Sequence, residues 1–396
     1  MLAPVPSQIR SPGPRNEHVL KLAFANLLKS CRAAAYVIIL PALLVSILPS
    51  NSAAQPVPVA PYKMTTFATG TDTIFAPDSV TFSATNVFIG YGNGGAPDGS
   101  GGAMSNVIEY DMKGKMVKNF PIVGHNDGLR YNPRENNLWA LQNEDGNATL
   151  IIINLKNGDQ TTYTLGTGPH GGGYDDIDFN NKSIYLSASA PTLMPDAAPA
   201  IVSLKLKGKT PELTGILNGN ATGVTNVLTG EPETLNLTDP DSMIVDPLGE
   251  LVMTSQGDGE LIIVQYPGLS CQKAFVVPLS SEAGPGPAET QLDDTVFTNQ
   301  SAGELLVADK GLNAVYAITA PYFAAAAYSA VQVFVPATAM NPSAAFVGQT
   351  DLTTGVVTPI LNNMGNPGGM AFIPSGVDLE KFIKASVQIP EVCPAS

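Results

Sequence analysis

A short segment recurs six times along this 396-residue chain, and the recurrence limits the possible folds more than any other feature. In each copy, two residues two positions apart face the same way, as in a short β-strand. The copies are PDSVTF (77–82), NDGLRY (126–131), YDDIDF (174–179), PDSMIV (240–245), LDDTVF (292–297) and PGGMAF (367–372). We therefore expect a fold that builds one strand-containing unit six times.

Further strands are predicted behind each of the first five copies, after turn residues such as Gly, Asn and Asp. Second strands are expected at 86–92, 137–143, 183–189, 250–256 and 304–310, and third strands at 105–111, 149–155, 200–206, 260–266 and 313–319. Four antiparallel strands repeated about every 50–75 residues are typical of β-propeller blades. We predict an all-β chain with six four-stranded blades, and the pattern leaves five or seven blades open.

The sixth copy has no strands behind it, so we expect the segment after Pro61 to complete its blade and close the ring. Two segments interrupt the repeat and are expected to be inserts, at 207–237 in the third unit and 321–350 in the fifth. The propeller domain is predicted to span 63–390, after a linker at 55–62 and before a C-terminal tail at 391–396.

The first 54 residues differ from the rest and have the pattern of a secretory signal peptide with a long n-region. Five basic residues precede an apolar run at 33–48, and small residues follow up to Ala54. The run of about 16 residues is shorter than the about 20 that span a bilayer. We predict a secreted or periplasmic protein without a stable membrane span, and an uncleaved anchor is the alternative.

Charge and cysteine content limit the partners of the exported chain. Removal of residues 1–54 changes the formal net charge from −14 to about −18, which disfavours nucleic acid and anionic membranes. Cys31 leaves with the signal, whereas Cys271 and Cys393 remain in an oxidising compartment. The sequence leaves open whether these two form a disulfide or stay free, and it does not predict an oligomeric state.

Two segments, GELLVADKGLNAVYAI (303–318) and GNPGGMAFIP (365–374), resemble blades of NHL-repeat propellers. Over about 300 residues the chain resembles the secreted bacterial propellers of the broad NHL-repeat and SMP-30 (gluconolactonase)-like group. The resemblance implies a six-bladed propeller that binds proteins or sugars, or that hydrolyses lactones and related esters with a divalent metal. The Glu, Asn and Asp ligands of the SMP-30 type do not align here, so the resemblance assigns no catalytic set.

An aspartate stands two residues before the first inward apolar position in five of the six copies, and Gly368 takes its place in the sixth. First strands line the axis of a propeller, so these carboxylates should meet at one level. Such a cluster favours a hard cation with oxygen ligands, and we predict a Ca²⁺ site with no organic cofactor. The alternative is that each aspartate caps a turn. The candidate metal ligands are Asp78, Asp127, Asp175, Asp241 and Asp293.

Other polar residues are expected on the same face, because the second strand of each blade returns to it. His125 and His170 precede two of the aspartates and are candidates for a general base and its partner, or else for polar loop residues. Candidate ligand-binding residues around them are Asn126, Asn143, Glu144, Tyr174, Gln256, Asp258 and Asp309.

The segment HGGGYDDIDF (170–179) contains the His-Gly-Gly-Gly of esterase oxyanion holes, but no Gly-x-Ser-x-Gly accompanies it. In register it is the loop and first strand of the third unit. Two functions are left open, and with them whether the chain is an enzyme. The first is binding of a small molecule, a glycan or a protein on the acidic axial face, with a structural cation. The second is metal-dependent lactone or ester hydrolysis.

Overall fold

A computed structural model describes residues 55–192, 194–281, 290–333, 345–388 and 392–393 of the chain. The predicted signal segment lies outside these residues. Within the described ranges, none of the helices has the length and apolar character that crossing a bilayer requires.

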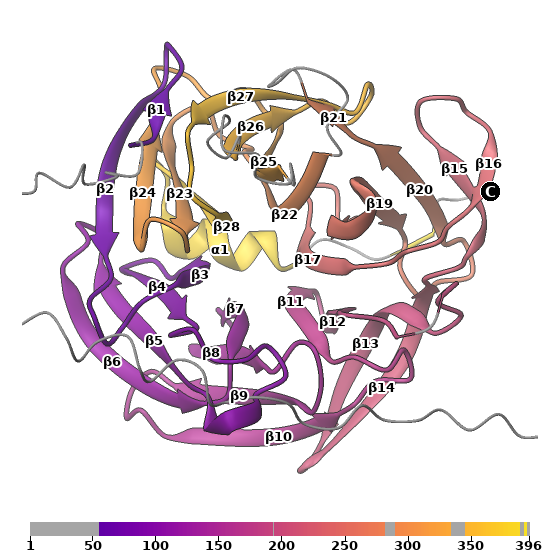
Figure 1. Ribbon diagram of the computed structural model, residues 1–396, viewed down its shortest axis with the longest axis horizontal. Helices are drawn as coiled ribbons and strands as arrows, with labels where there is room; N and C mark the ends of the chain where they lie inside the picture. Colours follow the sequence, from indigo (N-terminus) through magenta and orange to yellow (C-terminus); the bar gives the residue numbers. More distant parts are fainter. Residues whose placement is uncertain (1–54, 193, 282–289, 334–344, 389–391, 394–396) are drawn as a thin grey trace, which may run out of the picture. The chain divides into compact units, whose positions relative to one another are not determined.

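Six sheets, each built on four strands, surround one axis, which confirms the predicted six-bladed β-propeller (Figure 1). The innermost strand of each sheet contacts the next one around the ring. These inner strands are β3 (Pro77–Phe82), β7 (Asn126–Asn132), β11 (Tyr174–Asn180), β17 (Pro240–Val245), β22 (Thr290–Phe297) and β28 (Pro367–Pro374). All six were predicted, because each carries the repeated segment.

The first three blades follow the order of the chain. Behind their inner strands lie β4 (Asn86–Tyr91), β5 (Met104–Asp111) and β6 (Met116–Val123); β8 (Asn137–Gln142), β9 (Ala148–Asn154) and β10 (Gln160–Gly166); and β12 (Ser183–Ala188), β13 (Pro199–Lys207) and β14 (Thr210–Asn218). Apolar side chains pack between neighbouring blades. Trp139 of β8 meets Phe179 of β11 edge to face, with ring centroids 5.3 Å apart.

The predicted insert at 207–237 is wrong. Its first half is β14, the outer strand of the third blade, and its second half holds β15 (Thr222–Asn226) and β16 (Pro232–Thr234). The fourth blade consists of β17, β18 (Leu251–Ser255), β19 (Glu260–Gln265) and β20 (Lys273–Pro278). Because β15 pairs in parallel with β20, the supposed insert extends this sheet outward.

The last two blades are interleaved in the chain, which the sequence interpretation missed. β22 pairs with β25 (Ala327–Val333). In the same sheet, β25 pairs with β26 (Phe346–Thr350), and β26 pairs with β27 (Val356–Asn362). β23 (Gly303–Asp309) and β24 (Ala314–Thr319) belong instead to the sheet of β28. The assignment of 304–310 and 313–319 to the fifth blade, and of 321–350 to an insert, is therefore wrong.

Packing on both faces of β23 explains this exchange. Leu306 and Ala308 join a core cluster with Val80 of the first blade, whereas Leu305 and Val307 join one with residues of the fifth blade. The strand alternation of 304–310 suits any blade, so only these long-range contacts select the partner strand.

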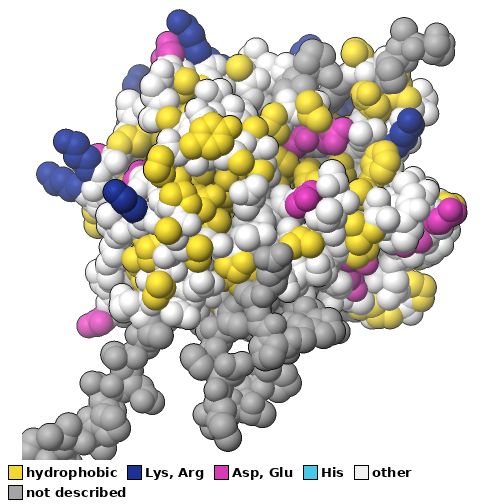
Figure 2. Space-filling model, turned by 90° about the horizontal axis from the view of Figure 1, so that it is seen from above, with side chains coloured by type: hydrophobic (Ala, Val, Ile, Leu, Met, Phe, Trp, Pro, Cys, Tyr) yellow, Lys and Arg dark blue, Asp and Glu magenta, His cyan; other side chains and the backbone are white. Residues whose placement is uncertain are grey.

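The segment after Pro61 closes the ring as expected, because β2 (Lys63–Thr69) pairs with β24 as the outer strand of the sixth blade. Within the predicted linker, β1 (Val57–Pro58) pairs with the outer edge of β27, as does β21 (Ser280–Ser281). One edge-on face of the molecule shows many hydrophobic side chains among few charged ones (Figure 2). Val57 and Val59, at β1, are 50% and 37% exposed.

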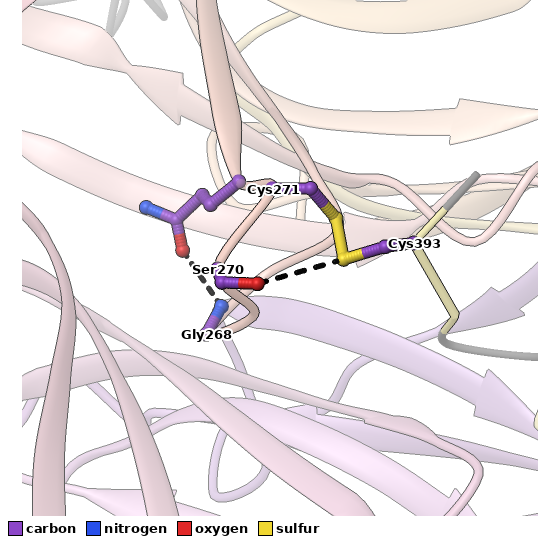
Figure 3. Close-up of a disulfide and its surroundings, with 5 residues drawn as sticks. Gly268, Ser270, Cys271 and Cys393 are labelled. Atoms are coloured by element: carbon purple, nitrogen blue, oxygen red, sulfur yellow. Dashed lines mark hydrogen bonds between the residues drawn. A yellow bond between two sulfur atoms is a disulfide. The ribbon is translucent and has the colours of Figure 1, made fainter. Parts of the chain in front are cut away.

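The C-terminal segment crosses the propeller axis and is tied back to it. The helix α1 (Leu379–Ser386) lies across the middle of the ring (Figure 1). Beyond it, Cys393 forms a disulfide with Cys271, with the sulfurs 2.03 Å apart (Figure 3). Of the two alternatives that the sequence left open for these cysteines, the structure contains the disulfide.

Candidate functional site

The repeated aspartates lie in β-bulges. In every inner strand the register shifts by one residue around the second and third positions of the repeated segment, where the aspartate stands in five blades. A bulge re-aims the side chains of its extra residues. The sequence therefore repeats a β-bulge together with the aspartate that the bulge orients.

We call Asp78, Asp127, Asp175, Asp241, Asp293 and Glu144 the axial carboxylate ring. One carboxylate oxygen each of Asp127, Glu144 and Asp175 lies within 4.8 Å of the others. Asp175 and Asp241 share a side-chain hydrogen bond. Glu144 follows β8, as the predicted return of the second strand requires.

Gly368 explains why the sixth blade lacks the aspartate. A Cβ atom at this position would lie 2.8 Å from Asp78 Oδ1 and 3.0 Å from Asp293 Oδ2. The fifth and first blades already fill this part of the axis with carboxylates, so a side chain on the sixth blade would crowd both.

Lys310, directly after β23, supplies a positive charge to the ring. Its Nζ lies 2.6 Å from Asp78 Oδ2. Burial disfavours the charged ammonium, but the carboxylates of Asp78, Asp293 and Glu144 outweigh burial and raise the pKa of Lys310. This residue therefore remains charged and balances part of the ring.

One ammonium does not neutralise six carboxylates. Burial first, and then like-charged neighbours, raise the pKa of Asp293 to about 7 and that of Glu144 to about 8. The same causes raise the pKa values of Asp175 and Asp241 well above the usual range. Glu144, Asp175 and Asp241 therefore need protons or a bound cation.

A hollow lies at the axis directly beneath the ring. It measures about 20 Å³ and is lined by aspartates of the ring, by Asp176 and Asp294, and by Arg130. That volume suffices for one water molecule or one ion. The lining is polar, so an apolar occupant is excluded on chemical grounds.

A buried ionic layer closes this hollow from below. Arg130 Nη2 lies 2.7 Å from Asp176 Oδ2, and Arg130 Nε lies 3.7 Å from Asp178 Oδ1. The guanidinium also donates to the carbonyls of Ile177 and Met243, at 2.9 and 3.0 Å. Asp176 also accepts a hydrogen bond from the Met243 N–H, and Asp294 accepts one from the Met370 N–H. The second aspartate of each Asp-Asp pair thus links two neighbouring inner strands.

The two predicted histidines occupy different environments. One ring nitrogen of His125 lies within 4.8 Å of carboxylate oxygens of Asp78 and Asp127. Burial lowers the pKa of His125, so its ring is neutral at neutral pH, and its buried Nδ1 has no hydrogen-bond partner. His170 is fully buried away from the ring, with its Nε2 2.7 Å from the Gly173 carbonyl and its ring against Tyr174.

The candidate ligand-binding residues divide in the same way. Gln256 reaches the ring, since its Nε2 donates to Asp293 Oδ1 at 3.4 Å. Glu144 is part of the ring itself. The other candidates are buried or bond to neighbouring chain segments. Asn126 and Tyr174 are buried, Asn143 accepts from the His125 N–H, Asp258 accepts from Thr238 and Ser255, and Asp309 accepts from the N–H groups of Leu312, Gly365 and Asn366.

No protein-family model matches this chain, and no curated protein matches it either. Several solved structures are similar to it. A protein of unknown function from Bacteroides caccae is 12% identical, with a TM-score of 0.45, over 75% of this chain and 86% of that one. A protein from Lactobacillus plantarum is 12% identical, with a TM-score of 0.42, over 75% and 88%.

A third similar structure, a candidate gluconolactonase, is 10% identical, with a TM-score of 0.40, over 67% of this chain and 94% of that one. The six-bladed fold follows from the sheet topology of the chain itself. At such identities, function has to be argued from the site itself.

Two residues of the site were missed in the sequence. Lys310 follows a strand that was assigned to the wrong blade, and Gln332, whose Nε2 donates to Asp293 Oδ1 at 2.7 Å, lies in the supposed insert. A lysine next to the predicted rim residue Asp309 was a usable signal. No local signal identifies Gln332.

Proposed function

We propose that this chain is an exported propeller that binds a Ca²⁺-type cation in its axial carboxylate ring and binds a small molecule, glycan or protein on the same face. The observation that carries the proposal is the group of Asp127, Glu144 and Asp175, with oxygens within 4.8 Å of one another. Ca²⁺ ligands lie at about 2.3–2.6 Å, so oxygens across one ion are about 5 Å apart. The carboxylates therefore fit such an ion.

Charge balance favours this group over the neighbouring group of Asp78, His125 and Asp127. Asp78 is already paired with Lys310. Among the described residues, no basic side chain forms an ion pair with Glu144 or Asp175. Hard cations prefer oxygen to imidazole nitrogen. The polar hollow beneath the ring offers room for an ion or its water. The disulfide and the signal-like first 54 residues support export.

Calorimetry with and without a chelator tests the cation. Ca²⁺ is expected to raise the melting temperature of the native chain. Asp175→Asn should abolish the rise, whereas Asp351→Asn, in the exposed turn between β26 and β27, should keep it. A native protein with the same melting temperature in Ca²⁺ and in chelator would contradict the proposal.

Hydrolysis of a lactone or ester is the second candidate, and His125 is the observation that favours it. Its ring is neutral and lies beside Asp78 and Asp127, as a general base next to a metal site requires. We expect divalent-dependent turnover of simple lactones that is lost in His125→Ala. If the native chain has no turnover while Ca²⁺ still raises its melting temperature, the binding function stands and hydrolysis does not.

A further inference from the structure

A second cavity lies on the axis, at the opposite end from the axial carboxylate ring. It has a volume of about 370 Å³, lies between α1 and the C-terminal halves of the inner strands, all six of which line it, and is partly open to solvent. Small-molecule sites typically have volumes of about 300–1,000 Å³. This space is therefore large enough for a ligand.

The walls of the cavity are mainly apolar and rich in aromatic rings. Phe82, Tyr131 and Phe297 come from three inner strands, and Phe382 faces them from α1. These side chains are only half-buried although they lie close to the axis of a closed ring. The helix thus spans the end of the channel without filling it.

The polar wall of the cavity carries negative charge. Arg130 and Asp178 form its inner end, so the buried ionic layer separates this cavity from the hollow under the ring. The guanidinium is already paired with Asp176 and Asp178, and Asp246 adds another carboxylate to the lining. Among the described residues Asp246 has no ion pair, so a bound anion would meet a lining with net negative charge, whereas a neutral donor group would find carboxylate acceptors.

The helix that covers the cavity is held in place from several sides. Ile383 and Val387 are buried against the blades. The Val387 carbonyl accepts hydrogen bonds from the Asn181 N–H and from Arg134 Nη2, both at 2.8 Å. Asp378 caps the first turn by accepting from the Lys381 N–H at 3.2 Å. The cover is therefore a fixed wall of the cavity.

We propose that this cavity is a binding site for a small, neutral aromatic molecule with one hydrogen-bond donor. The rings of the walls pack against the aromatic body, and the donor points to the Asp178 side of the cavity. This site is independent of the axial carboxylate ring and of its cation.

Titration calorimetry with indole tests the proposal, with benzoate as the anionic counterpart. One indole should bind per chain, equally with Ca²⁺ and with chelator, and benzoate should bind at least about tenfold more weakly. Ala385→Phe, in the α1 wall, should weaken indole binding by at least about tenfold because it fills the cavity. Lys381→Phe, at an 86% exposed side chain of the same helix, should leave binding unchanged.

Methyl NMR provides a readout that does not depend on the folding of any variant. Indole should shift the methyl signal of Met370, which lines the cavity, and leave that of Met253, buried in the fourth blade, unchanged. The proposal is overturned if millimolar indole does not bind, if Met370 does not respond, or if a folded Ala385→Phe binds indole as the native chain does.

Discussion

Lys310 balances negative charge of the axial carboxylate ring on the side of the first and fifth blades. Its ammonium contacts Asp78 at 2.6 Å and acts on Asp293 and Glu144. The opposite side of the ring has no such group among the described residues, and the proposed cation would take that role. The two halves of one ring are thus balanced in different ways.

Lys310→Met is expected to lower the free energy of unfolding by about 3 kcal/mol, because it leaves buried carboxylates without their partner. Urea denaturation measures the loss. Lys384→Met removes a lysine from an exposed pair with Glu380 and should change little. Equal effects of the two substitutions would show that the ring does not depend on Lys310.

The raised carboxyl pKa values predict how stability changes with pH. Asp293 and Glu144 keep their protons up to pH of about 7 and 8 in the folded chain, but lose them near their ordinary values when unfolded. The folded state then binds more protons between about pH 4 and 8, so stability falls as pH rises through this range. Thermal melts in chelator should show this fall.

A bound cation replaces those protons, so the stabilisation by Ca²⁺ should grow from pH 5 to about pH 8. Asp293→Asn should flatten the pH dependence in chelator, because one raised group is removed. A Ca²⁺ effect that is the same at both pH values would argue against binding to these carboxylates.

At the scale of elements, the N-terminal strands join the last two blades. β1 pairs with β27 of the fifth blade, and β2 pairs with β24 of the sixth. Between them the chain passes from one blade to its neighbour, so this segment both covers an exposed strand edge and completes the ring.

Truncation of the chain tests this closure. A chain that begins at residue 70 lacks both strands and should lose cooperative thermal unfolding, because the outer edge of β24 is left unpaired and that of β27 keeps only β21. A chain that begins at residue 55 keeps both strands and serves as the control. If the shorter chain melts as sharply as the control, the closing strands are dispensable.

At the scale of the whole propeller, the disulfide encloses a long stretch of chain. Cys271 and Cys393 are 122 residues apart in sequence, and between them lie most of the fifth and sixth blades and α1. A cross-link over such a loop restricts the unfolded chain strongly. It also ties to the fourth blade the chain that follows α1, the helix that covers the second cavity.

Replacement of both cysteines by serine should lower the free energy of unfolding by about 2–5 kcal/mol. Denaturant melts of the native chain with reductant should give the same loss. The rise in melting temperature with Ca²⁺ should persist, since neither cysteine belongs to the axial carboxylate ring or lines the hollow beneath it. Loss of that rise would mean that the tail and the ring are coupled.

The sequence by itself determined the six inner strands and the level of the aspartates, because strand alternation and the repeated bulge are local properties of each copy. It also indicated the closing strand β2 and the rim position of Glu144. The exchange of strands between the fifth and sixth blades was decided only by tertiary packing, because β23 alternates as any blade strand does. That exchange places Lys310 and Gln332 at the ring. The position of α1 across the axis creates the second cavity. Such contacts between distant segments leave no periodic pattern in the chain.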